Sequence, residues 1–143
     1  MTTLAYKDGV IAYDSRLTQG DIIHTDNAEK KYVRDGVSFF LCGNVCDYKD
    51  AISEWFGDTI AGNLEANGFV SDNEGVIWEF GSNESFWRNR IDISKSYSYG
   101  TGRRFALTAM DLGLSAKDAV KMAIRRDVYS GGKVNTFKCN AKG

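Results

Sequence analysis

The chain begins Met1-Thr2-Thr3, and removal of Met1 would make Thr2 the N-terminal residue. An N-terminal threonine carries its hydroxyl and its free α-amine on one residue, so that a nucleophile and a base come already joined. A free α-amine titrates at about 7.7–8.0, which is close enough to neutrality for it to accept the hydroxyl proton. The sequence therefore suggests covalent catalysis by Thr2. If Met1 is retained, Thr2 and Thr3 are only strand-forming residues.

Other catalytic chemistries have little support in the sequence. His24 is the only histidine, and within the segment GDIIHTDN it is interpreted as an ordinary polar residue of a loop. Cys42, Cys46 and Cys139 are odd in number and lack a Cys-x-x-Cys spacing, which is typical of reduced, buried thiols rather than of a zinc site. The chain contains no Gly-Lys-Ser or Gly-Lys-Thr of a phosphate-binding loop. We therefore expect no cofactor and no metal.

The composition describes a single domain over residues 1–143. The chain is 43% hydrophobic and 26% charged with a formal net charge of -1, so it lacks the basic excess typical of nucleic-acid-binding proteins. No apolar run approaches the roughly 20 residues that cross a bilayer, and the N-terminus lacks the layout of a signal peptide. The sequence predicts a cytoplasmic protein with neither a nucleic-acid nor a membrane partner.

Glycines and hydrophobic periodicity divide the chain into strands and helices. TTLAY and VIAYD flank Asp8-Gly9, a dipeptide favoured in two-residue hairpin turns. Apolar residues recur at helical spacing over residues 45–64, which predicts one long amphipathic helix. Strands are expected in VSFFLC, GVIWEF, SKSYSY and KVNTFKC, and helices over residues 105–112 and after a cap at Ser115. Strand-rich ends separated by helices predict two packed sheets with helices outside.

Four polar segments have simple structural explanations when each is taken alone. They are AYDSRLTQG, FLCGNVCD, YGTGRRFA and RRDVYSGGKVN. Their order and spacing, together with Thr2-Thr3 and Lys30-Lys31, resemble the proteasome β-subunit family, which includes the bacterial proteasome-like peptidase of the two-component ATP-dependent heat-shock protease. These proteins are N-terminal-nucleophile hydrolases. The stretch RDVYSGGKVN is the most specific part of the resemblance.

The resemblance implies an α+β fold, a four-layer αββα sandwich of two mostly antiparallel sheets with helices outside. Between the expected long helix and GVIWEF the chain has only EANGFVSDNE, where members of the family carry a second helix and a further strand. One helical layer is therefore expected to be reduced.

The resemblance also implies roles for individual residues. Thr2 would be the nucleophile, with its own amine as the base. Asp14 would be the carboxylate that keeps a lysine charged and in place, and this lysine would lower the pKa of the amine. Gly43 would present a backbone N–H to the tetrahedral oxyanion, where a side chain would obstruct the approach.

Five further positions match supporting residues of the family. Thr101, Asp127 and Ser130 would organise the amine and a water molecule. Thr18 would pair with the backbone of the bound peptide. Val45 would line the pocket for the side chain before the cleaved bond, and its size would exclude large aromatic groups.

The identity of the site lysine is ambiguous in the sequence. Counting without gaps from Asp14 selects Lys30, whereas the family habit of a double lysine followed by an apolar strand residue selects Lys31, with Tyr32 next. Neighbouring residues of a strand point to opposite faces, so only one of the two lysines can reach the site. The sequence reading favours Lys31.

Three functions remain open on the sequence. The leading one is a threonine peptidase that acts on peptides or unfolded proteins, works in a homo-oligomeric ring and is served by an ATP-dependent unfoldase. The second is a non-catalytic structural or interaction protein with the same fold. The third is an N-terminal-nucleophile amidase that acts on a small amide. Co-occurrence of the polar set favours catalysis.

Overall fold

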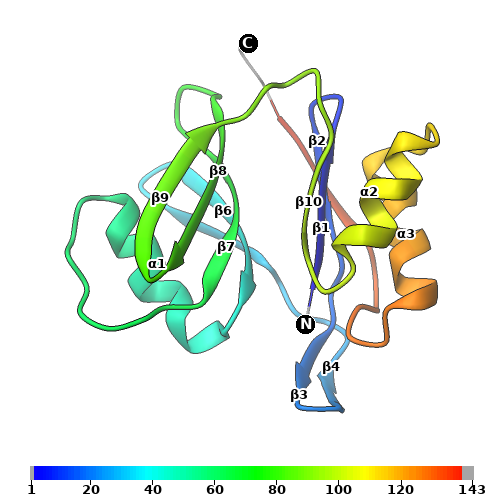
Figure 1. Ribbon diagram of the computed structural model, residues 1–143, viewed down its shortest axis with the longest axis horizontal. Coiled ribbons are helices and arrows are strands. Elements are labelled where there is room, and N and C mark those ends of the chain that lie inside the picture. The colour runs from blue at the N-terminus through cyan, green and yellow to red at the C-terminus, as the bar shows by residue number, and fades with distance from the viewer. Residues whose placement is uncertain (1, 140–143) are drawn as a thin grey trace.

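Two antiparallel sheets packed face to face form the centre of the structure, a computed structural model that describes residues 2–139. The first sheet comprises, in spatial order, β10 (Tyr97–Gly100), β1 (Thr3–Lys7), β2 (Val10–Tyr13) and β11 (Asn135–Lys138). The second comprises β5 (Lys31–Arg34), β6 (Val37–Gly43), β7 (Ala66–Ser71), β8 (Ile77–Asn83) and β9 (Ser85–Arg90). Every pairing within the two sheets is antiparallel. Figure 1 shows the sheets facing one another.

Helices cover the outer face of each sheet. Helices α2 (Arg103–Asp111) and α3 (Ala116–Arg126) lie on the first sheet, where alanines at the contact allow helices and strands to approach closely. Helix α1 (Tyr48–Trp55) follows a short 3-10 helix, η1 (Val45–Asp47), and packs on the second sheet through a cluster rich in aromatic side chains. The fold is therefore an αββα sandwich in which the helical layer on the second sheet is reduced to α1. Both features confirm the fold class predicted from the sequence.

A third apolar cluster fills the space between the two sheets. Leu4 and Tyr6 of β1 and Ile11 of β2 contact Phe40 of β6 and Phe69 of β7, and all five side chains are fully buried. The continuous apolar character of β6 follows from its position, because it is covered by the first sheet on one face and by α1 on the other.

The hairpin β1–β2 turns at Asp8-Gly9, as predicted. Asp8 has φ of 51° and Gly9 has φ of 81°, so both central residues of the turn are left-handed, which matches the twist of the flanking strands. The register pairs Leu4 with Tyr13. Asp14, the next residue, therefore lies beside the N-terminal end of β1, and the backbone N–H of Asp14 donates to the carbonyl oxygen of Thr3.

The expectation of one helix over residues 45–64 is wrong. Helix α1 ends at Trp55, and a turn at Gly57, whose φ of 102° favours glycine, leads into irregular chain up to residue 65. The expectation that a further strand is missing here is also wrong, because the segment EANGFVSDNE contains β7, which lies at the centre of the second sheet.

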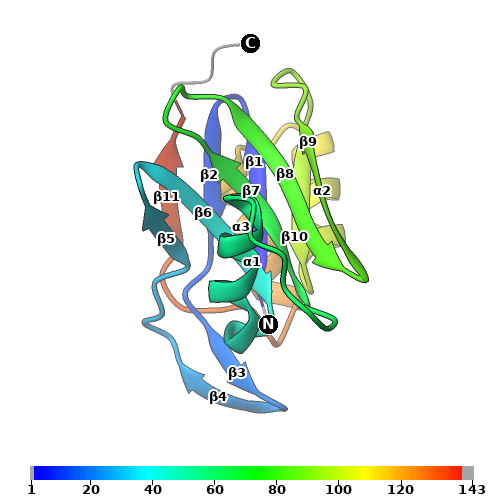
Figure 2. The same ribbon diagram turned by 90° about the vertical axis from the view of Figure 1, so that its left-hand side faces the viewer.

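The segment GDIIHTDN, expected to be a loop, contributes its residues Ile22–Thr25 to a hairpin that begins at Leu17. Strands β3 (Leu17–Gln19) and β4 (Ile22–Thr25) pair with one another, and His24 lies in β4. Figure 2 shows this hairpin projecting beyond the two sheets at the end where the chain begins. No helix within residues 2–139 is long and apolar enough to cross a membrane.

Candidate active site

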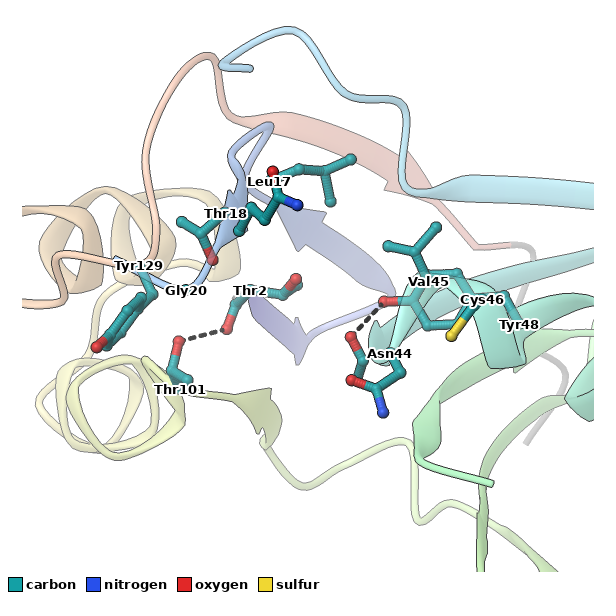
Figure 3. A pocket seen from close by; sticks show the side chains of 12 residues that line it. Thr2, Leu17, Thr18, Gly20, Asn44, Val45, Cys46, Tyr48, Thr101 and Tyr129 are labelled. Atoms are coloured by element: carbon teal, nitrogen blue, oxygen red, sulfur yellow. Dashed lines mark hydrogen bonds between the residues drawn. The ribbon is translucent and has the colours of Figure 1, made fainter. Parts of the chain in front are cut away.

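A cavity of about 710 Å³ opens at the end of the sandwich from which the β3–β4 hairpin projects. Five of the residues singled out from the sequence line it together, namely Thr2, Thr18, Gly43, Val45 and Thr101. Figure 3 shows Thr2 between two walls, with Thr18 and Tyr129 on one side and Val45 and Cys46 on the other. We refer to this space as the Thr2 cavity.

Beneath the cavity floor, Thr2 contacts a buried ion pair. Lys30 Nζ lies 3.0 Å from Thr2 Oγ1 and 2.7 Å from Asp14 Oδ1. The exposed fractions of Thr2, Lys30 and Asp14 are only 1%, 1% and 0%. Burial lowers the pKa of the Lys30 ammonium, and the negative charge of Asp14 opposes this shift. We refer to Asp14, Lys30 and the Thr2 hydroxyl as the Lys30 cluster.

Four donors converge on the Asp14 carboxylate. Besides Lys30, the backbone N–H groups of Thr3, Arg16 and Gly131 donate to it at 3.1, 3.3 and 2.9 Å. Each of the two carboxylate oxygens accepts two of these hydrogen bonds. Asp14 thereby ties together three chain segments around the lysine.

The preference for Lys31 is wrong, since Lys30 is the lysine that reaches Thr2. Lys30 immediately precedes β5, whereas Lys31 is its first residue and pairs with Phe40 in β6. Successive side chains alternate in direction, and Lys31 Nζ accordingly lies 5.4 Å from the centre of the Phe137 ring. The ungapped count from Asp14 was the correct guide.

A second polar cluster lies on the other side of Thr2. Asp127 ends α3, and its Oδ2 accepts hydrogen bonds from the hydroxyls of Thr101 at 2.6 Å and Ser130 at 2.7 Å. The Thr101 hydroxyl also lies 3.4 Å from the carbonyl oxygen of Thr2, and the Ser130 hydroxyl is hydrogen bonded to that of Thr3 at 2.7 Å. We refer to Thr3, Thr101, Asp127 and Ser130 as the Asp127 cluster. It holds the backbone at the start of β1.

Gly43 ends β6 at the cavity wall and has φ of 116°. A Cβ built at this position would lie 2.1 Å from the carbonyl oxygen of Glu65, so no side chain can be accommodated. The fold therefore requires glycine at this position, as does the predicted role of its backbone N–H toward the oxyanion.

Thr18 and Val45 lie on opposite walls of the Thr2 cavity. Thr18 belongs to β3, and Val45, which is 49% exposed, is the first residue of η1. All the predicted site residues except Lys31 thus lie at the cavity or directly beneath it.

Sequence reasoning missed the residues that fix the loop after α3. Arg16 pairs with Asp26 at 2.8 Å and donates to the carbonyl oxygen of Val128 at 3.0 Å. A Cβ at Gly131 would lie 2.4 Å from the Arg16 guanidinium. Arg16 belongs to the motif AYDSRLTQG, and Val128 and Gly131 belong to RRDVYSGGKVN. More than 100 residues separate the two motifs, so no local pattern in the sequence indicates that they are in contact.

The thiols differ from expectation in one case. Cys42 and Cys139 are buried, and burial raises the pKa of each thiol to about 12. Cys46, expected to be buried, is exposed and lines the Thr2 cavity. Within residues 2–139, no group of three or more His, Cys, Asp or Glu side chains could hold a metal ion.

Comparison with solved structures identifies proteins of the same fold. HslV from the eukaryote Trypanosoma brucei aligns with a TM-score of 0.69 at 19% identity, covering 95% of this chain and 97% of that one. BPH from Thiobacillus denitrificans aligns with TM-scores of 0.64 alone, at 17% identity, and 0.68 in complex with Epoxomicin, at 18% identity. These alignments cover 95% of this chain and 95% and 96% of the BPH chains. No protein-family model and no curated protein matches the sequence.

The fold is thus that of the proteasome-like peptidases of the HslV type. The resemblance inferred from the order of the motifs is confirmed at this level, by an agreement over nearly the full length of both chains. Identities of 17–19% establish the fold alone, and the activity rests on the chemistry of the site.

Proposed function

We propose that this protein is a threonine peptidase that cleaves peptide bonds through Thr2 once Met1 has been removed. Met1 itself lies outside the described residues. The observation that carries the proposal is the position of Lys30 Nζ, 3.0 Å from Thr2 Oγ1 and paired with a fully buried Asp14. A hydroxyl beside a buried ammonium loses its proton more readily, because the positive charge stabilises the developing alkoxide.

The reaction follows from this arrangement. The Thr2 oxygen attacks the carbonyl carbon, and its proton passes to the free amine of the same residue and then to the leaving nitrogen. The new C–O bond gives a tetrahedral intermediate, and its collapse breaks the peptide C–N bond, leaves an ester on Thr2 and releases an amine. Water, activated by the same amine, then hydrolyses the ester, releases the carboxylic acid and restores the threonine.

Two neighbouring groups support these steps. The backbone N–H of Gly43 is proposed to stabilise the tetrahedral oxyanion, consistent with the glycine that the cavity wall requires. The Asp127 cluster holds the start of β1, so that the Thr2 amine and the attacking water are oriented by Thr101 and Ser130.

The Thr2 cavity would hold the peptide on the acyl side of the cleaved bond. Thr18 in strand β3 lines one wall and is proposed to pair with the backbone of an extended peptide, and Val45 on the opposite wall is proposed to limit the side chain before the cleaved bond. Substrates with a small or medium apolar residue at this position are expected to be cleaved, and those with Phe or Trp are not.

The motif resemblance and the HslV-type fold also support an assembly. We propose a cytoplasmic homo-oligomeric ring that encloses the Thr2 cavities and receives peptides or unfolded proteins from an ATP-dependent unfoldase. Native mass spectrometry of the intact protein tests the ring, and a monomer as the sole species would contradict it.

The nucleophile is tested with protein in which Thr2 is the first residue. A cleavable leader is placed directly before Thr2 and removed after the protein has folded, which exposes the Thr2 amine. Intact mass spectrometry verifies that Thr2 is the first residue. A panel of fluorogenic peptide amides should be hydrolysed by this protein, and Thr2→Ala should abolish turnover while leaving the thermal unfolding midpoint nearly unchanged. Thr2→Ser retains a hydroxyl and should keep measurable activity.

The matched control is the same protein with one glycine left before Thr2. The extra residue converts the amine into an amide and removes the proposed base, so turnover should be lost with the hydroxyl still present. Activity that survives either Thr2→Ala or the added glycine would refute the mechanism. Absence of hydrolysis in the exposed-threonine protein, together with binding of a protein partner, would identify the non-catalytic alternative.

A further inference from the structure

A smaller cavity of about 350 Å³ adjoins the Thr2 cavity. The two share Gly43 and Thr101 in their walls. The remaining lining of the smaller space, which we call the adjoining cavity, comes from β6, β7, β10 and the start of α2 and comprises Cys42, Asn67, Ser98, Tyr99, Gly100 and Arg103. Neither the β3–β4 hairpin nor η1 contributes to it.

The adjoining cavity lies where the second half of a cleaved peptide would be. This step rests on the proposed function, in which the acyl half occupies the Thr2 cavity between Thr18 and Val45. The chain that follows the cleaved bond continues away from that half, past Gly43 and Thr101. Because these two residues form the boundary between the cavities, the amine half enters the adjoining cavity.

The lining of this cavity offers a positive charge that has no acidic partner among residues 2–139. Arg103 is the first residue of α2, lines the cavity with an exposed side chain, and donates from Nη1 to the carbonyl oxygen of Gly100 at 3.1 Å. Arg103 forms no ion pair with any of residues 2–139. No Asp or Glu lines the cavity, and the Tyr99 hydroxyl at its wall is already donated to Glu79.

A second donor faces the same space. The side-chain oxygen of Asn67 accepts a hydrogen bond from the Cys42 thiol, whereas its amide nitrogen makes no hydrogen bond to the part of the chain that the structure describes. The free Asn67 N–H groups and the remaining Arg103 donors are complementary to an oxyanion with two oxygens.

We propose that the adjoining cavity binds a carboxylate on the amine side of the cleaved bond, and that Arg103 makes the protein select peptides with that group. The carboxylate can come from an Asp or Glu side chain one or two residues after the bond, or from the free C-terminus of a short peptide. Both sources present the same two oxygens to the guanidinium.

Binding to Thr2→Ala protein tests the proposal without turnover. Four peptides share a Val before the bond and a Gly after it, and differ only in the next residue, Glu or Gln, and in the terminus, acid or amide. Calorimetric titration at low salt should give about three- to tenfold tighter binding for peptides with a carboxylate, and the advantage should shrink as salt screens the charge. The Glu amide and the Gln acid distinguish the two sources.

Arg103→Gln should abolish the difference between the four peptides. Arg104→Gln is the matched control, because Arg104 is the next residue along α2 and lines a different groove between α2 and α3. It should preserve the preference. Equal binding of all four peptides, no binding of any, or a preference that survives Arg103→Gln would overturn the proposal.

Failure of this proposal is distinguishable from failure of the proposed function. In a peptide joined to a small uncharged fluorophore, the fluorophore is the amine half and carries no carboxylate, so its hydrolysis by the exposed-threonine protein reports the nucleophile without any contribution from the carboxylate preference. Hydrolysis without a carboxylate preference in the titrations would refute the role of Arg103 and would not contradict the proposed peptidase function.

Discussion

The two polar clusters that flank Thr2 differ in what they touch. In the Lys30 cluster, Lys30 contacts the hydroxyl oxygen of Thr2. In the Asp127 cluster, Thr101 contacts the backbone of Thr2 and Ser130 contacts the side chain of Thr3. The first contains two opposite charges at 2.7 Å, and the second is centred on a carboxylate that accepts two hydroxyl hydrogen bonds. The difference separates chemistry at the reacting atom from placement of the strand that carries it.

The clusters also differ in how a substitution would affect them. Removing one member of a buried ion pair leaves an uncompensated charge, which costs about 3–5 kcal/mol, more than the roughly 1.5–3 kcal/mol of a hydrogen bond to a charged group. Variants in the Lys30 cluster should therefore affect activity and stability together, while variants in the Asp127 cluster should have the smaller effect on both.

The largest effect is expected for Lys30→Met. The variant removes the cation beside Thr2 Oγ1 and leaves Asp14 buried without its ion pair, so peptide hydrolysis should fall to background and the free energy of unfolding should fall by about 3–5 kcal/mol. Denaturant titration and fluorogenic peptide hydrolysis measure the two quantities.

Lys31→Met is the matched control for that variant. It changes the adjacent lysine, whose ammonium lies over the Phe137 ring, and should change the free energy of unfolding by less than about 1 kcal/mol without a loss of turnover. A larger loss of activity in Lys31→Met than in Lys30→Met would reverse the assignment of the site lysine.

A smaller effect is expected for Asp127→Asn. The substituted amide retains one acceptor, but the hydrogen bonds from Thr101 and Ser130 are no longer made to a charged group. Turnover should fall by about 10- to 100-fold, which corresponds to the roughly 1.5–3 kcal/mol of a charged hydrogen bond. Steady-state kinetics measures the loss of turnover in both variants. A loss in Asp127→Asn equal to that in Lys30→Met would contradict the distinction between the two clusters, because both would then act at the reacting atom.

The pH dependence of Lys30 sharpens the comparison further. Burial lowers the pKa of Lys30 from its ordinary value of 10.5, so between the folded and unfolded pKa values the folded state binds fewer protons than the unfolded state. The contribution of Lys30 to the free energy of unfolding therefore rises with pH in this window. Activity should fall over the same window, because the ammonium beside Thr2 loses its charge.

These opposite trends are checked by parallel pH series. The difference in unfolding free energy between the wild-type protein and Lys30→Met should change over the window in which turnover declines. If turnover declines only at or above pH 10.5, the ordinary pKa of lysine, Lys30 is not the group whose titration limits activity.

Local patterns predicted the elements that local chemistry determines. The Asp8-Gly9 turn, the buried strand now seen as β6 and the Ser115 cap all follow from residues close in sequence, and Asp118 N–H donates to Ser115 Oγ as the cap requires. The helix predicted over residues 45–64 failed because apolar residues of the irregular segment, such as Ile60, pack on the same aromatic cluster as α1 and imitate helical spacing.

Most of the candidate site followed from the order of motifs rather than from geometry. Asp14, Gly43, Thr101, Asp127 and Ser130 all lie at or beneath the Thr2 cavity, and the roles that the resemblance implies for them stay predictions. The choice between Lys30 and Lys31 depended on where β5 begins, and strand boundaries are the least certain part of a sequence reading. Arg16 and the adjoining cavity could not be predicted, because both depend on contacts between segments far apart in the chain.

The contact between Thr3 and Ser130 has a consequence for the newly made protein. The two hydroxyls are separated by 127 positions, and one of the four donors to Asp14 is the backbone N–H of Gly131. A ribosome-bound chain therefore carries the proposed nucleophile for nearly the whole of translation without these contacts from Ser130 and Gly131. For the peptidase that we propose, the order of synthesis would act together with Met1, which blocks the amine, to keep an unfinished chain from attacking the proteins around it.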